Sequence, residues 1–349
     1  MDWNALPITP VILSRIAELE EFKGSWKTLK TLAPEKLTEL RKTATIESVG
    51  SSTRIEGVKL TNKEIELLLN NLQTNAFQSR DEEEVAGYAE AMETVFNSWE
   101  QIPLTENNVC QLHRILLKYS AKDEYHKGKY KGVSNQVEAF DADGKSVGVI
   151  FQTAAPFETP RLMQELIAET KQALDDQILH SLLVIGVFIV RFLAIHPFQD
   201  GNGRLSRILT TLLLLRSGYA YVPYSSLESV VEENKEGYYL ALRRTQLTLN
   251  NLQPDWNPWL DFFLNALCRQ KQRLAVKIER EGLLQKSLPE LSIKILELVT
   301  ERGQATISDL ETLTGEKRSR VKFRLAELVE QGYLLQRGQG RGVWYAANV

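Results

Sequence analysis

Hydrophobic residues with helical spacing recur along most of the chain. The segment SLLVIGVFIVRFLAI, residues 181–195, is apolar on nearly every side, and at this length it predicts a buried helix rather than a membrane span. A second apolar segment, residues 204–218, predicts another helix that ends at a glycine. Runs with strand-like alternation are few, so the pattern predicts a mainly α-helical protein.

More helices are predicted on the N-terminal side of this apolar pair. The first begins with Thr9 as a cap and Pro10 at the first helical position, an arrangement typical of helix starts. The third follows a threonine cap, and the fourth opens with a cluster of acidic residues. The predicted helices cover residues 9–26, 33–50, 60–72 and 81–101.

Aromatic residues mark the C-terminal side of the apolar pair. Residues 226–246 predict one helix that carries Tyr238 and Tyr239. Because the two tyrosines are adjacent, their rings must face different surroundings. Trp256 and Trp259 have helical spacing with the phenylalanines that follow them, which favours core packing over a cofactor site.

Residues 128–153 interrupt the helical pattern with short runs of strand-forming residues. The runs flank residues 141–144, where Asp-Gly is a hairpin signal, so a two-stranded flap is predicted. Asn135 and Val137 lie in this region. The residues alone leave open whether the flap is an ordinary surface hairpin or a surface that binds a target.

The C-terminal part of the chain changes character. Residues 261–284 predict a long and increasingly charged linking helix. After it, residues 285–349 predict three helices and a two-stranded hairpin with a glycine-rich turn at 338–342. This order indicates a small separate module.

Composition limits the class of protein. The 349 residues are 43% hydrophobic and 25% charged, which is typical of a soluble protein with two or three domains. A formal net charge of -3 argues against a globally basic nucleic-acid binder. Cys110 and Cys268 form no C-x-x-C, so neither a zinc site nor a disulfide framework is indicated. No signal peptide is visible, and a cytoplasmic protein without membrane contact is expected.

The segment HPFQDGNGRLSR, residues 196–207, joins the two apolar helices. Pro197 disfavours helical geometry at His196, which should place the His196 ring at the start of a loop. Phe198 is expected to fix this loop by apolar packing. The GNG sequence at 201–203 then leads into a helix N-terminus, where free N–H groups and the positive end of the helix dipole favour an anion.

Charged side chains in this segment suit a polyphosphate. Arg204 and Arg207 lie three residues apart, so both can reach oxygens of the same ligand from one helix face. Asp200 would suit Mg²⁺, which prefers one or two carboxylates together with substrate phosphates. His196, with an unperturbed pKa of about 6.5, suits the removal of a proton from a hydroxyl nucleophile.

These residues resemble the Fic family motif H-x-F-x-[DE]-G-N-G-R-x-x-R at every defined position. The resemblance implies transfer of AMP from ATP to a Ser, Thr or Tyr hydroxyl of a target protein, or of the chain itself, with release of pyrophosphate. It implies that His196 is the general base, that Asp200 binds Mg²⁺ and that Arg207 holds the γ-phosphate. The other nucleotide-binding residues it implies are Gly201, Asn202, Gly203, Arg204, Tyr238 and Tyr239.

A second segment, residues 52–57, resembles the inhibitory motif [ST]-x-x-x-E-[GN] of many Fic proteins through Ser52, Glu56 and Gly57. A Glu56 carboxylate paired with Arg207 would occupy the site of the γ-phosphate and repel it. ATP would then bind with its α-phosphate misaligned for attack. The sequence leaves open whether this inhibition acts within one chain or across a homodimer.

The resemblance also bears on the flap and the C-terminal module. In Fic proteins such a flap lies over the nucleotide and pairs with the extended backbone of the target. The C-terminal module resembles a winged helix-turn-helix, with residues 319–330 as the recognition helix and 338–342 as the wing. Its basic residues near these elements are Lys317, Arg318, Arg320, Lys322, Arg324, Arg337 and Arg341. The net charge from residue 286 onward is only about +2, so DNA contact and protein contact both stay open.

The predicted architecture is a mainly α Fic-type core with a hairpin flap, followed by a winged helix-turn-helix. We expect an N-terminal inhibitory region at 1–84, a catalytic core at 85–260, a linking helix at 261–284 and the module at 285–349. The predicted function is an adenylyltransferase inhibited by Glu56. The alternative is a transcriptional regulator that binds DNA and senses nucleotide or removes AMP at the Fic site. The intact His196 favours the enzyme, because a pure sensor needs no general base.

Overall fold

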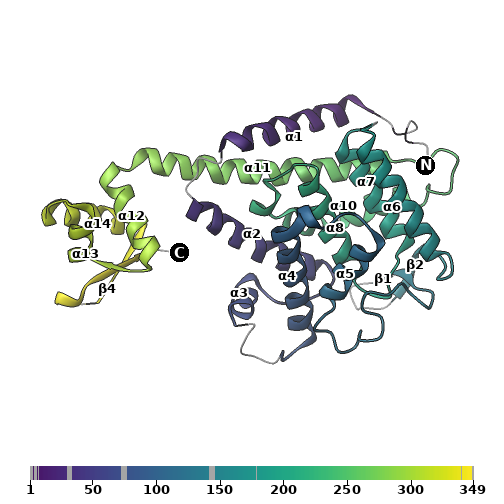
Figure 1. Ribbon diagram of the computed structural model, residues 1–349, viewed down its shortest axis with the longest axis horizontal. Helices are drawn as coiled ribbons and strands as arrows, with labels where there is room; N and C mark the ends of the chain where they lie inside the picture. Colours follow the sequence, from purple (N-terminus) through teal and green to yellow (C-terminus); the bar gives the residue numbers. More distant parts are fainter. Residues whose placement is uncertain are drawn as a thin grey trace. The chain divides into compact units, whose positions relative to one another are not determined.

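The computed structural model describes residues 3, 6, 8–29, 34–71, 77–140, 146–177, 179–338 and 340–347. The chain divides into two compact units, Met1–Leu274 and Ala275–Val349. Helices dominate both units (Figure 1), which confirms the predicted fold class. None of the helices in the described part of the chain is long and apolar enough to cross a membrane.

In its described residues, the first unit contains ten complete α-helices and the beginning of an eleventh. Single 3-10 turns at Trp99–Gln101 and Val222–Tyr224 lie between them. The helices are α1 (Pro10–Leu29), α2 (Pro34–Ile55), α3 (Asn62–Asn70), α4 (Arg80–Ser98), α5 (Glu106–Leu116), α6 (Thr159–Asp175), α7 (Ser181–Ile195), α8 (Asn202–Arg216), α9 (Leu227–Glu233), α10 (Lys235–Gln246) and α11 (Asn257–Ser287).

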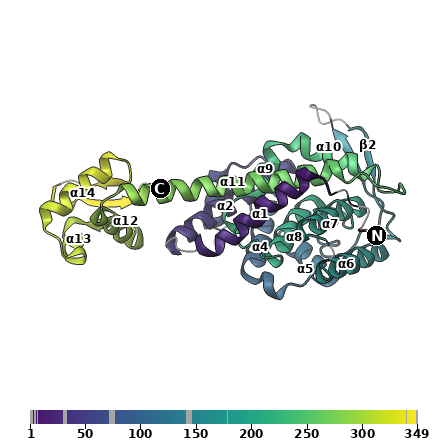
Figure 2. The ribbon, with the colours of Figure 1, turned by 90° about the horizontal axis from the view of Figure 1, so that it is seen from above.

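Helices α7 and α8 form the centre of this unit. They pack on each other, α6 covers α7, and both α4 and α5 contact α8. The view from above shows α8 between α4 and α7 (Figure 2). Every residue of α8 from Arg204 to Leu215 is buried, as the unbroken apolar pattern predicted. The turn that joins two such helices is consequently held inside the unit.

Most helix bounds agree with the sequence pattern, and one prediction was wrong. Helix α7 ends at Ile195, as the following proline required. Residues 226–246 form two helices instead of one, because Asn234 leaves the helical region with φ -125° and ψ 46°. Its side-chain oxygen lies 2.5 Å from the place where a Cβ on Gly237 would stand, so the glycine makes room for the break.

The flap consists of two antiparallel strands, β1 (Gln136–Phe140) and β2 (Ser146–Gln152). Gln136 pairs with Gln152, and the register shifts between Val137 and Glu138. The Asp-Gly hairpin signal lies within residues 141–145, which fall outside the described residues. The two strands that it was expected to connect are present.

The second unit has its own core. Its elements after α11 are α12 (Glu290–Arg302), β3 (Ala305–Thr306), α13 (Ile307–Thr314), α14 (Arg318–Glu330), β4 (Leu334–Arg337) and β5 (Trp344–Ala347). The strands form an antiparallel sheet in the order β3-β5-β4, so the predicted hairpin gains a short third strand. The three predicted helices enclose a cluster that includes Ile295, Leu310, Val321, Leu325 and Leu334. The winged helix-turn-helix assignment stays a prediction.

Leu325→Ala should destabilise the second unit by about 2–5 kcal/mol, because Leu325 is fully buried and its truncation leaves a cavity. Phe323, on the same helix, is 59% exposed, and Phe323→Ala should change stability by less than about 0.5 kcal/mol. Native-state hydrogen exchange of α12 and α14 in the full chain measures both values. Equal exchange in the two variants would contradict this core assignment.

Candidate functional site

The candidate site is built on the turn between α7 and α8, residues 196–201. His196 follows the last residue of α7 in the left-handed region, with φ 53° and ψ 61°. Its N–H still donates to the carbonyl of Phe192 over 2.9 Å. At the other end of the turn, Gly201 has φ 79° and serves as the N-cap of α8. Because left-handed backbone is uncommon for a residue with a side chain, neighbouring contacts must hold His196 in place.

Phe198 anchors the middle of this turn. Its fully buried ring stacks on His113 of α5 with 3.8 Å between the ring centres. Asn202 binds the Phe198 main chain: the Phe198 N–H donates to Oδ1 over 2.9 Å, and Nδ2 donates to the carbonyl over 2.7 Å. Phe198 thus fixes the turn by apolar packing, as expected. The Asn202 side chain serves the turn itself, and its role toward phosphate stays a prediction.

His113 of α5 also supports this turn, although the sequence pattern did not predict it. Its Nδ1 accepts the N–H of Gly128 over 2.9 Å, and its Nε2 lies 2.9 Å from the carbonyl of Asp200. Burial lowers the pKa of His113 to about 4, so the ring is neutral and donates from Nε2. A single histidine on an amphipathic helix belongs to no motif, and only the fold reveals its contact with Asp200.

Asp200 has several positively polarised neighbours. Its Oδ1 accepts the N–H of Gly201 over 2.5 Å and a hydrogen bond from Arg204 Nη2 over 3.1 Å. Its Oδ2 is 3.4 Å from Arg80 Nη2. Burial alone would raise the pKa of Asp200, but Arg204 and the Gly201 N–H outweigh it and lower the pKa. Asp200 is therefore a carboxylate at neutral pH.

The two arginines of α8 have different partners in the structure. Arg204 is 3% exposed, and its Nη1 lies 2.8 Å from Oε2 of Glu84 on α4. Glu84 also pairs with Arg80 over 2.7 Å. Nε of Arg204 is buried without a hydrogen-bond partner among the described residues. Arg207 instead turns toward the end of α2, so binding of one polyphosphate by both arginines stays a prediction.

Ser52 and Glu56 from the end of α2 hold Arg207. Nε of Arg207 donates to Oγ of Ser52 over 2.7 Å, and Nη2 donates to the Ser52 carbonyl over 3.0 Å. Nη2 also donates to Oε1 of Glu56 over 2.7 Å. Burial disfavours the charged form of both side chains, but the opposite charge of the partner outweighs this effect. The pKa of Glu56 is therefore lowered, and the pKa of Arg207 is raised. The structure therefore brings the predicted inhibitory residue and the predicted phosphate-binding residue into an ion pair, in which Arg207 is buried and Glu56 is 30% exposed.

Gly203 gives Glu56 its position. A Cβ on Gly203 would stand 2.2 Å from Oε1 of Glu56, closer than a non-bonded carbon and oxygen can approach. The Glu56 carboxylate consequently lies directly against the first turn of α8. That turn has no side-chain cap, because its N-cap is Gly201.

The end of α2 is fastened to α9. Arg54 forms two hydrogen bonds with Glu232, over 2.6 and 2.9 Å. Gly57 then turns the chain with φ 105°, the left-handed conformation that a glycine adopts without strain. Beneath this contact, the hydroxyl of buried Tyr88 donates to Glu228 over 3.0 Å. These contacts fix the backbone that presents Glu56.

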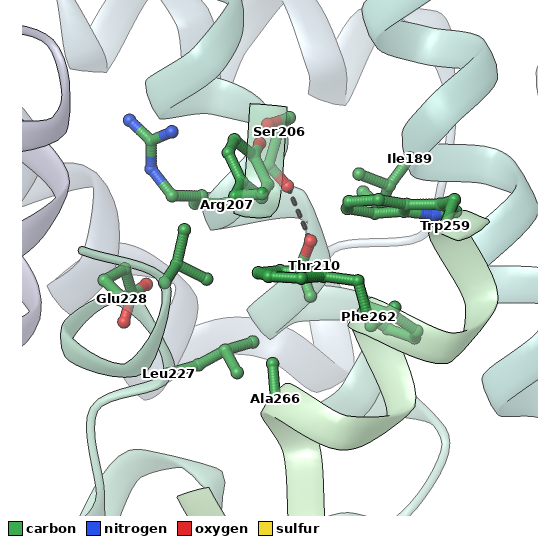
Figure 3. Close-up of a pocket in the computed structure, with 12 residues that line it drawn as sticks. Ile189, Ser206, Arg207, Thr210, Leu227, Glu228, Trp259, Phe262 and Ala266 are labelled. Carbon is green, nitrogen blue, oxygen red and sulfur yellow. Dashed lines mark hydrogen bonds between the residues drawn. The ribbon is translucent and has the colours of Figure 1, made fainter. Parts of the chain in front are cut away.

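The two tyrosines of α10 differ, as their adjacency required. Tyr238 is buried against Trp259, whereas Tyr239 is 39% exposed. Trp259 is buried as well, as predicted. Tyr238 helps to line a cavity of about 30 Å³ beside α8. Figure 3 shows that the Arg207 guanidinium points away from Trp259 and Phe262, which also line this cavity. This volume suits about one water molecule and is too small for an adenine ring.

Comparison with known proteins identifies the fold. Residues 103–214 match the Fic/DOC family. The chain is 26% identical over 231 residues to a protein adenylyltransferase Fic of Drosophila grimshawi, which covers 66% of this chain and 44% of that protein. A Fic domain containing signaling protein from Bacteroides thetaiotaomicron has a TM-score of 0.62 and 27% identity, over 75% of this chain and 97% of that one. A Fic family protein from Desulfovibrio desulfuricans shares the fold over 98% of this chain and 97% of that chain, with a TM-score of 0.62 and 21% identity.

The matched residues 103–214 include the whole of the turn and most of α8, so this part of the chain is a helical domain of the Fic type. The chain spans less than half the length of the protein adenylyltransferases that it matches.

His196 should titrate near pH 4 instead of near pH 6.5. Burial lowers the pKa of this half-buried ring to about 4. The imidazole is therefore neutral and able to accept a proton at physiological pH, and it becomes protonated only in acid. A proton NMR titration of the four histidines, with His196→Ala to assign the signal, measures this value. A midpoint above about 6 would contradict the buried environment described here.

Proposed function

We propose that this protein transfers AMP from ATP to a hydroxyl group of a protein. The observation that carries the proposal is that three groups lie around the start of α8. They are the uncapped N-terminus of this helix, the neutral ring of His196 in the turn before it, and the guanidinium of Arg207, whose partner Glu56 lies against Gly203. Uncapped N–H groups and a buried arginine bind phosphates, and a neutral imidazole accepts a proton. The relatives named protein adenylyltransferase support the same activity.

In this reaction the target oxygen attacks the α-phosphorus of ATP. Its proton passes to His196, the bond between the α-phosphorus and the bridging oxygen breaks, and pyrophosphate leaves. Nδ1 of His196 lies 3.3 Å from the carbonyl of Leu193. A proton on Nδ1 that is donated to this carbonyl leaves the Nε2 lone pair free to act as the base. The buried turn fixes the ring, which orients the base before the target arrives.

The residues present fit a magnesium ion that arrives with the nucleotide. Asp200 is an ionised carboxylate, 34% exposed, at the start of α8. No group of three metal-ligating side chains occurs among the described residues. A single carboxylate suits Mg²⁺, which takes its other ligands from phosphates and water. Asp200 would hold the ion, and the ion would neutralise charge on the phosphates. The unpartnered Nε of Arg204 offers a further donor to an anion.

We also propose that Glu56 inhibits the transfer. Its carboxylate occupies the Nη2 donor of Arg207 and lies against Gly203, so it takes the place that a terminal phosphate would need. An ATP molecule that cannot reach Arg207 holds its α-phosphorus out of line with His196. An extended segment of the target would pair with main-chain groups of an edge strand of the flap, a form of β-augmentation. Whether a homodimer forms stays a prediction.

Glu56→Gly should raise AMP transfer on the order of 100-fold above the parent, because relief of a misalignment of about 1 Å has that effect. Intact-mass spectrometry of the purified chain after incubation with MgATP measures self-modification. Glu56→Gln keeps the shape of the side chain without its charge and should give an intermediate rate. His196→Ala in the Glu56→Gly background should abolish transfer.

Two outcomes of that comparison would contradict the proposal in different ways. Equal labelling of the parent and Glu56→Gly would remove Glu56 from the inhibitory role. Labelling that survives His196→Ala would remove His196 from the role of base.

DNA binding by the second unit is the alternative function, and its ion pairs weigh against it. On and beside α14, Arg318 pairs with Glu311 over 2.7 Å and Arg320 pairs with Glu316 over 2.9 Å. Arg324 pairs with a glutamate of its own helix. A DNA reader needs such side chains to neutralise phosphates. The order of three helices and a small sheet nevertheless supports the winged helix-turn-helix assignment. For this module the ion pairs favour contact with a protein over contact with DNA.

The full chain should show no salt-dependent affinity for double-stranded DNA. A gel shift with mixed genomic fragments at rising salt concentrations measures this, because phosphate contacts weaken steeply as salt increases. Lys322→Ala, which removes an exposed basic side chain of α14, is the matched variant. Binding that falls with salt and weakens in Lys322→Ala would restore the DNA alternative.

A further inference from the structure

Lys131 contacts the main chain on both sides of His196. Its Nζ donates to the carbonyl of Ile195 over 3.0 Å, and its main-chain N–H donates to the carbonyl of Pro197 over 2.8 Å. Lys131 is 3% exposed. The residue before His196 and the residue after it are thus held by the same buried lysine, which lies outside the family motif.

The ammonium group of Lys131 has a full set of acceptors. An ammonium carries three N–H donors. They are directed at the Ile195 carbonyl, at Oδ1 of Asn135 over 2.8 Å and at Oγ1 of Thr153 over 2.9 Å. Among the side chains that the structure describes, no carboxylate forms an ion pair with it. The three acceptors match the three N–H donors of the charged form.

The acceptors of Lys131 belong to the base of the flap. Asn135 precedes β1, and its Nδ2 donates to the carbonyl of Phe198 over 2.8 Å. Thr153 follows β2, and its hydroxyl donates to the carbonyl of Asn135 over 2.7 Å. The same cluster therefore closes the two ends of the flap and fastens them to the turn that carries His196.

We propose that Lys131 is the positioning residue for the base: it holds His196 in its left-handed conformation and couples the flap to the catalytic turn. The inference rests on the proposed AMP transfer, for which it names a residue that acts through His196. Left-handed backbone at a histidine persists only where the surroundings impose it, and Lys131 holds the carbonyls of Ile195 and Pro197, the residues before and after His196. A target segment bound to the flap would consequently be positioned by the same cluster that positions the base.

The charge of Lys131 also acts on the His196 ring. Burial is the main cause of the lowered pKa of His196, and the neighbouring Lys131 cation lowers it further, while Glu56 and Asp200 raise it. Burial lowers the pKa of Lys131 itself to about 8. Removal of this cation should therefore raise the pKa of His196 toward its ordinary value.

The first test is Lys131→Met in the Glu56→Gly background. We expect kcat for AMP transfer to fall on the order of 100-fold with KM for ATP little changed, because a displacement of about 1 Å at the base has that effect and the phosphate-binding groups are untouched. Lys131→Arg keeps the charge and several donors and should recover part of the loss. Lys129→Met, an exposed lysine two residues away, is the matched control and should stay within about twofold of its parent.

The second test needs no activity. In the chain with Glu56 intact, Lys131→Met should raise the titration midpoint of His196 in the proton NMR spectrum, whereas Lys129→Met should not. Hydrogen exchange at Phe198 should accelerate only in Lys131→Met. A folded Lys131→Met with an unchanged kcat, an unchanged His196 midpoint and unchanged exchange would overturn the inference. If the Glu56→Gly parent transfers no AMP, the proposed function fails by itself, and the NMR titration still decides the role of Lys131.

Discussion

The site depends on the turn that joins two fully buried helices. The chain must leave α7 and enter α8 within a few residues, and it does so by adopting left-handed backbone at both ends, at His196 and at Gly201. The glycine adopts this conformation without strain, but the histidine does not. Phe198 and Asn202 lock the turn between them. Because the strained residue is also the proposed base, the ring of His196 is directed by the path of the chain and not by its own rotamer alone.

Burial of two arginines on the first turns of α8 sets the second constraint. A buried cation without a partner is strongly destabilising, so each arginine requires negative charge nearby. Arg204 has Glu84 and Asp200, whereas the only carboxylate bound to Arg207 among the described residues is Glu56. Displacement of Glu56 would leave Arg207 unpaired unless another anion replaced it, and a terminal phosphate is such an anion. The same arginine thus stabilises the state in which Glu56 is bound to it and would stabilise a nucleotide-bound state.

The sequence predicted the helical fold, both apolar helices and the turn between them, because periodicity and one proline determine these features locally. It also predicted that Glu56 would meet Arg207, through resemblance to a known motif. It could not predict Lys131, His113 or Glu84, which reach the turn from elements distant in the chain. Their contacts depend on tertiary packing, and each is an ordinary residue within its own segment. The break at Asn234 was missed because the hydrophobic spacing continues across it.

The attachment of α2 determines how Glu56 can leave Arg207. Arg54 binds Glu232 in a bidentate pair, and its side chain is only 25% exposed, so the end of α2 is held to α9 by more than a weak surface contact. Glu56 lies one residue beyond the helix, next to Gly57. Rotation of the Glu56 side chain breaks a single hydrogen-bonded pair and leaves Arg54 in place. Removal of the whole segment would break the Arg54 pair as well as both contacts of Ser52. We infer that separation of Glu56 from Arg207 begins at the Glu56 side chain, with α2 still docked.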